Sequence, residues 1–483
     1  MAGVSGIGSG INIDSIVASM VAAERAPKAS QLSSLEKKAT TQITAIGALK
    51  SAISDFQTAL GALSKPSVFQ ARSATSSRSD LVGVTASSSA GAGRYQVQVD
   101  ALAASSKVAL AAFPNTAGAP ARFASGTLAI TLGASTDGAS PAESFSIVVG
   151  ESNNTLAGMR DAINSAGKDA GVSATIVSDS HGARLVLSGE KTGAGRDISV
   201  TVPQDQAEAG LESLAKLASS AVADPLEAGP KVLATAKSAL LYIDGLEITS
   251  TTNKVEGAIE GVTLDLKAQT AANELLTINI AEDKAGVKNQ IQSFVDAYNK
   301  LIGVINAQTK VTSVGGDKVP VTGALVGDAT ARSLLSTIRN ELVSPQGAGA
   351  LRALTDIGIT TQKNGTLKIE DEKLEKALTN HFADLSALFA GDKGIANRLD
   401  EKLKPYTQTG GILEQRNKIM SETISKIDKQ KANLDRRITS LQERLYKQFN
   451  AMDALVGQLS STSSSLLASL ENLPWAAGNS KRL

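Results

Sequence analysis

The chain has 483 residues, of which 42% are hydrophobic and 3% aromatic, and its 48 Lys and Arg nearly balance 47 Asp and Glu. This balance excludes strong electrostatic attraction to nucleic acid or anionic membranes, and no run approaches the ~18 apolar residues that a membrane span needs. The absence of cysteine excludes disulfides and thiolate chemistry, and two distant histidines, His181 and His381, predict neither a metal site nor a cofactor. A length of 483 residues favours about three domains.

The first segment places apolar residues among glycines, in "GVSGIGSGINIDSIVASM" from Gly3. It lacks the basic-then-apolar layout of a cleaved secretory signal. The glycines disfavour helix by roughly 1 kcal/mol each, so we expect the start to be flexible. We expect its apolar side chains to be buried by other molecules; they are Ile7, Ile11, Ile13, Ile16, Val17, Met20 and Val21.

A long helix is predicted from Pro27 to about Ser64, with Pro27 in its first turn and separating it from a shorter helix before it. Apolar residues follow at spacings of three and four, which is typical of a coiled-coil seam. The predicted seam residues of this helix are Leu32, Leu35, Ile46, Leu49, Ile53 and Phe56, within a longer run that ends at Leu63.

The middle of the chain predicts small β-rich and α+β domains. Residues 144–202 suggest strand, helix and three strands, with the helix starting at Leu156, capped by Asn154 or Thr155 and ended by Gly167. Asp244-Gly245 and Asn364-Gly365 predict hairpin turns. Helices are expected from about Asp283, over 329–343 and from Asp371.

The C-terminal part repeats the heptad pattern from Met420 to Leu466, with Leu434, Ile438, Leu441 and Leu445 in the predicted seam. We expect the two terminal helices to pair with each other and to carry everything between them. Two separate helices on a globular body are the alternative. Leucines continue among serines as candidates for further contacts, at Leu459, Leu466, Leu467 and Leu470.

No constellation of catalytic residues emerges, so an enzyme is not expected. No phosphate-loop motif occurs, and "GAGRD" follows a strand without opening a helix. The acidic run Glu370, Asp371 and Glu372 begins a predicted helix, where carboxylates favour the helix dipole.

Several segments, in their usual order, resemble the flagellar filament cap family, also called hook-associated protein 2 or FliD. They include "GIGSGINIDSIVASMVAAERAP" near the start, "IDGLEITSTTNKVEGAIEGVTLDL" at 243–266, "FVDAYNKLI" at 294–302, "ALVGDATARSLLSTIR" at 324–339 and "LTDIGITTQKNGTLKIEDEKL" at 354–374. Residues 155–200 are also similar to an insertion module of flagellins. The resemblance covers nearly the whole chain.

The resemblance implies an α+β multidomain fold with long terminal helices and inserted β-rich head domains. The implied domains are a terminal helical core (1–46 with 445–483), a helical leg (47–78 with 282–444), an inner head (79–106 with 225–281) and an outer head (107–224). It also implies a ring of about five subunits at the distal tip of an extracellular filament, which helps flagellin to fold and insert and prevents loss of monomers.

The implied partners are flagellin, neighbouring subunits, hook-filament junction proteins and an export chaperone, with export by the flagellar type III route. The N-terminal apolar residues would then contact neighbouring subunits or flagellin, and the C-terminal leucines neighbouring subunits or the chaperone. Two alternatives stay open: a hook-filament junction protein, and an adhesin whose head binds host mucin or glycans.

Overall fold

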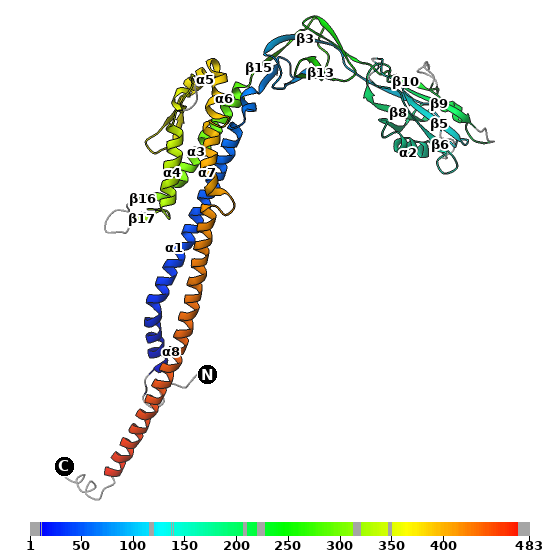
Figure 1. The fold of residues 1–483 in the computed structure, drawn as a ribbon. Helices are drawn as coiled ribbons and strands as arrows, with labels where there is room; N and C mark the ends of the chain where they lie inside the picture. The colour runs from blue at the N-terminus through cyan, green and yellow to red at the C-terminus, as the bar shows by residue number, and fades with distance from the viewer. Residues whose placement is uncertain are drawn as a thin grey trace, which may run out of the picture. The chain divides into compact units, whose positions relative to one another are not determined.

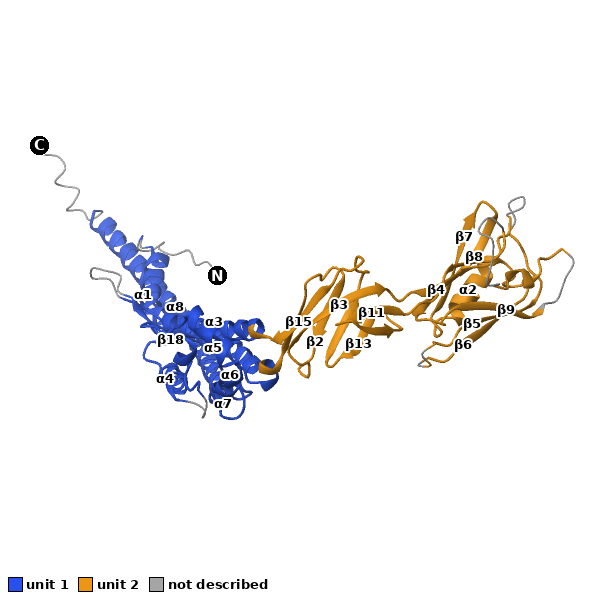
Figure 2. Cartoon of the chain, turned by 90° about the horizontal axis from the view of Figure 1, so that it is seen from above, with its two compact units in different colours: residues 1–68, 285–483 blue, residues 69–284 orange. Residues whose placement is uncertain are grey.

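The computed structural model describes residues 10, 12–114, 120–136, 138, 140–205, 210–219, 228–312, 320–345 and 350–471. The chain forms two compact units (Figure 2), one of residues 1–68 with 285–483 and one of residues 69–284. We call them the helical unit and the sheet unit. The N- and C-terminal parts of the chain therefore share one unit, while the middle forms the other.

Two long helices dominate the helical unit (Figure 1): α1, Ile13–Leu63, and α8, Ile412–Glu471. They run antiparallel, because Glu24 pairs with Arg437 near one end and Lys50 with Glu414 near the other. The predicted pairing of the terminal helices is confirmed. The chain enters α1 and leaves α8 at the same end of the pair. At that end α8 continues past the start of α1 (Figure 1).

Pro27 lies inside α1 and does not separate two helices, so the predicted break is wrong. A proline removes one backbone hydrogen bond and disfavours the helical turn before it. Here Val17 on one side of Pro27 and Leu32 on the other are both buried. Packing on both sides keeps the helix continuous despite this local cost.

A bundle of shorter elements surrounds the C-terminal half of α1. Asp328 caps α4 and Gly394 precedes α7, whereas the acidic first turn of α5 begins at Asp371 as predicted. The elements are α3 (Lys284–Thr309), β16 (Val311–Thr312), β17 (Val321–Thr322), α4 (Ala329–Val343), η3 (Leu354–Ile357), β18 (Ile359–Thr361), β19 (Leu367–Ile369), α5 (Asp371–Asn380), α6 (Phe382–Phe389) and α7 (Ile395–Thr407).

The sheet unit contains two hydrophobic cores, and we name a lobe for each. In the five-strand lobe, a sheet of order β1-β15-β3-β11-β12 packs on a sheet of order β13-β14-β2. The turn at Asp244 and Gly245 joins β11 to β12 with both residues at positive φ, as the sequence predicts. Its elements are η1 (Pro66–Gln70, which leads in), β1 (Arg72–Ser76), β2 (Val82–Ala86), β3 (Gly93–Ala101), β11 (Ala239–Ile243), β12 (Leu246–Ser250), β13 (Lys254–Ile259), β14 (Val262–Leu266) and β15 (Leu276–Glu282).

The α2 lobe packs α2 against two sheets, of order β10-β4-β8-β7 and β6-β5-β9. Thr155 caps α2 by accepting from the Gly158 N–H, and Gly167 ends it, as predicted. The elements are β4 (Ser105–Ala109), β5 (Gly126–Leu132), β6 (Glu143–Val149), α2 (Leu156–Ala166), β7 (Val172–Asp179), β8 (Gly182–Thr192), β9 (Ile198–Asp205), η2 (Leu214–Leu217) and β10 (Lys231–Ala234).

Candidate functional site

The C-terminal half of α1 is anchored by an aromatic cluster. The ring of Phe56 lies 5.6 Å from that of Phe294 and 5.8 Å from that of Tyr298, measured between centroids. The Tyr298 hydroxyl donates to the Gly365 carbonyl at 2.9 Å, and burial raises the pKa of Tyr298. Buried aromatic pairs stabilise a fold beyond the contribution of the apolar area that they bury. This end of α1 is therefore held more firmly than the other.

The N-terminal half of α1 meets α8 along a narrower contact that is flanked by ion pairs. Arg25 lies 2.8 Å from Asp435, Arg437 lies 2.7 Å from Glu24, and Lys431 pairs with Glu36. Because these side chains are a third or more exposed, each pair contributes little stability. Their value is to fix the register of the two helices.

A less exposed ion pair fastens α8 to α4. The Asp328 carboxylate accepts from the Ala331 N–H at 3.0 Å, which caps α4, and also from Arg416 Nη1 at 2.8 Å. Hydrogen bonding to Arg416 lowers the pKa of Asp328, and the same bond raises that of Arg416. This carboxylate holds the start of one helix and the first turns of another.

The predicted N-terminal contact residues divide into three groups. Ile13 and Val17 are 1% and 0% exposed because they pack with Leu445 of α8, so the expectation that other molecules bury them is wrong. Ile16 is half-buried and Met20 is 46% exposed. Ile7 and Ile11 lie outside the described residues.

Most predicted seam residues are covered by the helical unit. Leu32, Ile46, Leu49, Ile53 and Phe56 of α1 and Ile438 and Leu445 of α8 are buried, while Leu434 and Leu441 are half-buried.

Leu35 is 47% exposed, so the prediction that it lies in the seam is wrong. Successive residues of an α-helix are about 100° apart, and Leu35 is therefore roughly 60° round α1 from the buried Leu32. The spacing of three and four runs through two faces of α1: one meets α8, and the other meets the bundle farther along.

The predicted C-terminal contact residues form an exposed apolar stripe on α8. Leu459 is 68%, Leu466 58%, Leu467 59% and Leu470 48% exposed, and Leu455 upstream is 59% exposed. The start of α1 packs beside Leu445, so within the described ranges α8 has no helical partner by this point. A stripe of this kind on a soluble surface indicates a site of protein contact.

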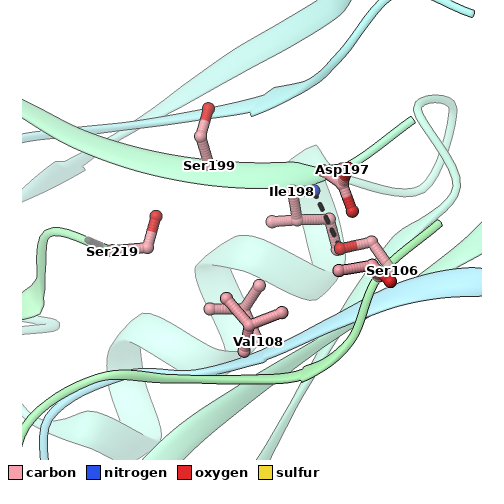
Figure 3. Close-up of a pocket in the computed structure, with 8 residues that line it drawn as sticks. Ser106, Val108, Asp197, Ile198, Ser199 and Ser219 are labelled. Carbon is pink, nitrogen blue, oxygen red and sulfur yellow. Dashed lines mark hydrogen bonds between the residues drawn. The ribbon is translucent and has the colours of Figure 1, made fainter. Parts of the chain in front are cut away.

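The α2 lobe has a hollow of about 350 Å³ with several hydroxyl groups in its wall (Figure 3). Ser106 Oγ accepts from the Ile198 N–H at 2.9 Å, and Ser219 Oγ accepts from the Val200 N–H at 2.7 Å. Asp197 accepts from the Ala236 N–H at 2.8 Å. These groups tie neighbouring strands together, and the arrangement offers no nucleophile paired with a base.

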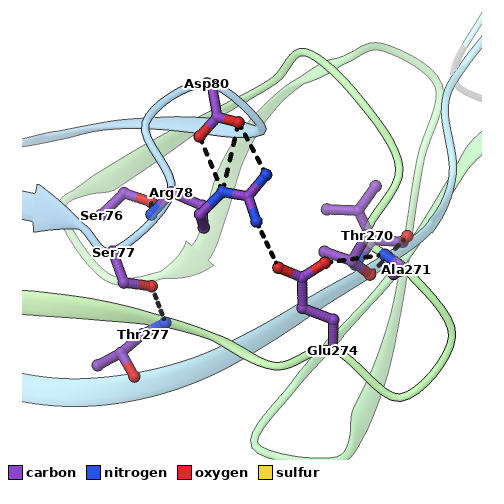
Figure 4. Close-up of polar contacts among 9 residues, drawn as sticks. Ser76, Ser77, Arg78, Asp80, Thr270, Ala271, Glu274 and Thr277 are labelled. Atoms are coloured by element: carbon purple, nitrogen blue, oxygen red, sulfur yellow. Dashed lines mark hydrogen bonds and ion pairs between the residues drawn. The ribbon is translucent and has the colours of Figure 1, made fainter.

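Polar contacts in the five-strand lobe are likewise structural (Figure 4). Arg78 donates to Asp80 at 2.9 Å and to Glu274 at 2.6 Å, and Glu274 accepts from the Ala271 N–H at 3.1 Å. Hydrogen bonding to Arg78 lowers the pKa of Asp80. The cluster holds the loop before β15 against the turn between β1 and β2.

Two kinds of site are absent from the part of the chain that the structure describes. No group of three or more His, Cys, Asp or Glu side chains is placed to hold a metal ion. No described helix is long and apolar enough to cross a membrane.

The fold defines a class of protein in which two long terminal helices pair with each other and the chain between them forms separate sheet lobes. Family models for the flagellar hook-associated protein 2 N-terminus and C-terminus match residues 9–106 and 236–461, and the flagellin hook IN motif matches residues 129–191. The chain belongs to the flagellar hook-associated protein 2 family.

Similarity to relatives extends over the full length. The chain is 48% identical over 482 residues to the B-type flagellar hook-associated protein 2 of Pseudomonas aeruginosa, covering 99% of both chains. It is 32% identical to flagellar hook-associated protein 2 of Escherichia coli K12, covering 98% of this chain and 99% of that one. A crystal structure of the flagellar cap protein FliD D1-D2-D3 domains from Escherichia coli matches with a TM-score of 0.60 and 28% identity, over 78% of this chain and 99% of that one.

Two features of the helical unit were not found from the sequence. The Asp328–Arg416 pair joins residues 88 positions apart, and only the cap position of Asp328 before the predicted helix gave a local signal. A hollow beside Lys37 and Lys38 depends on a loop from residues 322–326, which no periodicity in α1 reveals.

Proposed function

We propose that this protein caps the tip of the growing bacterial flagellar filament, outside the cell, and promotes the folding and insertion of flagellin while limiting its loss. The observation that carries the proposal is the exposed leucine stripe of α8, in a chain that matches the hook-associated protein 2 family end to end. The role is mechanical, with no chemical step.

The stripe supports assembly because its apolar side chains are exposed among the residues that the structure describes. Burying one leucine contributes about 1.5–3 kcal/mol, so a few of them suffice to hold a neighbouring subunit or another apolar partner. We propose that Leu459, Leu466, Leu467 and Leu470 contact neighbouring subunits in a homo-oligomeric ring, and an export chaperone before secretion by the flagellar type III route.

At the other end of the chain, Ile16 and Met20 stay accessible beside α8 and are our remaining described candidates for contact with flagellin or a neighbouring subunit. The sheet unit would form the head of the cap. Contact with the hook-filament junction proteins is expected while the first flagellin subunits are being added.

The test is to delete the gene and measure flagellin on cells against flagellin free in the medium. We expect bald cells and abundant free monomer, restored by the intact gene. A variant with Leu459→Ser, Leu466→Ser and Leu467→Ser should fold normally yet fail to restore filaments, because these side chains are exposed in the free chain.

The matched control is Val343→Ser, which changes a side chain that is 73% exposed elsewhere in the helical unit and should restore filaments fully. Normal filaments on the deletion strain would contradict capping. Full restoration by the triple variant would retain capping and refute the role of the stripe.

A further inference from the structure

The sheet unit contains a junction at which the chain passes twice between the five-strand lobe and the α2 lobe. One passage joins β3 to β4, and the other joins β10 to β11. The passages are antiparallel and bonded to each other, because Ala104 and Lys237 exchange two backbone hydrogen bonds of 2.9 Å. Among the described residues, the hydrophobic cores of the two lobes are separate. The orientation of one lobe on the other therefore depends on contacts at the junction.

Each passage is held by a side chain of the lobe that it leaves. Asn253 of the five-strand lobe accepts from the Ala103 N–H at 2.7 Å, and its Nδ2 donates to the Ala103 carbonyl at 3.0 Å. Asp197 of the α2 lobe accepts from the Ala236 N–H at 2.8 Å. These bonds fix where each passage leaves its lobe, but they do not join the lobes to each other.

A third contact joins the two lobes directly. The Thr192 hydroxyl, at the end of β8, donates to the carbonyl of Thr251, which follows β12, at 2.6 Å. Two residues farther on, the Ala194 N–H donates to Ser238 Oγ, beside the start of β11, at 3.0 Å. We call Thr192, Ala194, Ser238 and Thr251 the latch. Its two hydrogen bonds carry the end of β8 onto the five-strand lobe.

Gly193, in the middle of this contact, allows the lobes to approach closely. Its φ of +112° is a backbone conformation that residues with a side chain rarely adopt. A Cβ added at Gly193 would also lie 3.0 Å from Cβ of Thr251. A side chain at this position would therefore strain the turn and push Thr251 away. The latch can close because a glycine stands here.

The latch consists of hydroxyl and backbone groups and contains no packed apolar side chains. Thr192, Ser238 and Thr251 are half-buried. Water can reach half-buried polar groups, and it can replace hydrogen bonds between them at a small net cost. The latch can therefore open without exposing the hydrophobic core of either lobe.

We propose that the latch is a conformational switch within the sheet unit. When it is closed, it holds the α2 lobe in one orientation on the five-strand lobe. When it is open, the α2 lobe turns about the two passages, residues 102–104 and 235–238, as a hinged body. The bonds described above are those of the closed state. This proposal depends on contacts within the sheet unit and not on the capping function.

Distances between two spin labels in the full-length protein test the latch, since the chain has no cysteine of its own. The labels are attached to Thr85→Cys in β2 and Ser165→Cys in α2, two exposed positions outside the latch. We expect one narrow distance distribution when the latch is intact. Thr192→Val with Ser238→Ala removes both hydroxyls and should broaden this distribution by roughly twofold.

The matched control for the hydroxyl variant is Ser144→Ala with Thr201→Val in the labelled protein. These substitutions remove two exposed hydroxyls from β6 and β9 of the α2 lobe and should leave the width of the distribution unchanged. A broad distribution with the latch intact would overturn the proposal, and so would equal widths for the two double variants.

Gly193→Ala provides a second test that keeps the latch hydroxyls. It should broaden the distance distribution and speed amide hydrogen exchange at residues 193–194 by roughly tenfold, while exchange at residues 185–187 of β8 stays slow because the α2 lobe remains folded. The control is Gly210→Ala, since Gly210 has a φ of +85° but an added Cβ would meet nothing within 4 Å. Equal broadening by the two glycine variants would refute a role for the close approach to Thr251.

Discussion

At the scale of single residues, the Asp328 carboxylate has two roles. It caps α4, and it accepts a hydrogen bond from Arg416. Removing a cap costs about 1 kcal/mol, and leaving a partly buried guanidinium unpaired adds a similar amount. We predict that Asp328→Ala lowers the free energy of unfolding of the helical unit by about 2 kcal/mol in chemical denaturation. Arg25→Ala, which removes an exposed ion pair, should lower the free energy of unfolding by less than about 1 kcal/mol. Similar losses from the two variants would show that Asp328 contributes no more than an exposed ion pair does.

The lowered pKa of Asp328 also predicts how this contribution varies with pH. Its pKa when folded lies below the unfolded value near 3.9, so its stabilisation is present above that unfolded value and is lost as the pH falls through the folded pKa. As the pH falls below about 4, the unmodified protein should therefore lose more of its free energy of unfolding in chemical denaturation than the Asp328→Asn variant does. Parallel curves for the two proteins would contradict this assignment.

At the scale of elements, α1 has a covered face and an open face, and Leu32 and Leu35 are a matched pair that separates them. Leu32 is 1% exposed and Leu35 47%. We predict that Leu32→Ala costs about 2 kcal/mol through lost packing, whereas Leu35→Ala changes the free energy of unfolding by less than about 0.5 kcal/mol. Equal losses in the free energy of unfolding, measured by urea denaturation, would show that Leu35 packs in the seam as Leu32 does.

The same pair of leucines shows what the sequence could and could not predict. Hydrophobic periodicity and capping residues predicted α2, α4 and α5. The dipeptides Asp244-Gly245 and Asn364-Gly365 predicted turns. These predictions succeeded because their signals are local in the sequence. Spacing of three and four could not say which side of α1 meets which partner, since that depends on where the bundle ends. The predicted break at Pro27 failed for a similar reason. Packing of α1 on both sides of Pro27 outweighs the local cost of a proline within a helix.

At the scale of the whole molecule, the sheet unit should fold without the helical unit. Its two ends come together, because Arg72 of β1 pairs with Glu282 of β15 and the Asp283 N–H donates to the Ala71 carbonyl at 3.0 Å. We predict that residues 69–284 expressed alone unfold cooperatively, at a temperature within a few degrees of one transition of the full chain in calorimetry. An unfolded fragment would show that the sheet unit needs the helices.

The uneven anchoring of α1 gives the helical unit a direction in which it resists mechanical load. At the start of α1, Ile13 and Val17 rest on Leu445, whereas at the other end Phe56 is enclosed by Phe294 and Tyr298. A pull on the N-terminus meets the thin contact first, and the helix can unwind one turn at a time against a small force. A pull transmitted through the junction with the sheet unit meets the aromatic cluster first. The helical unit should therefore open under load more easily at the start of α1 than at its end.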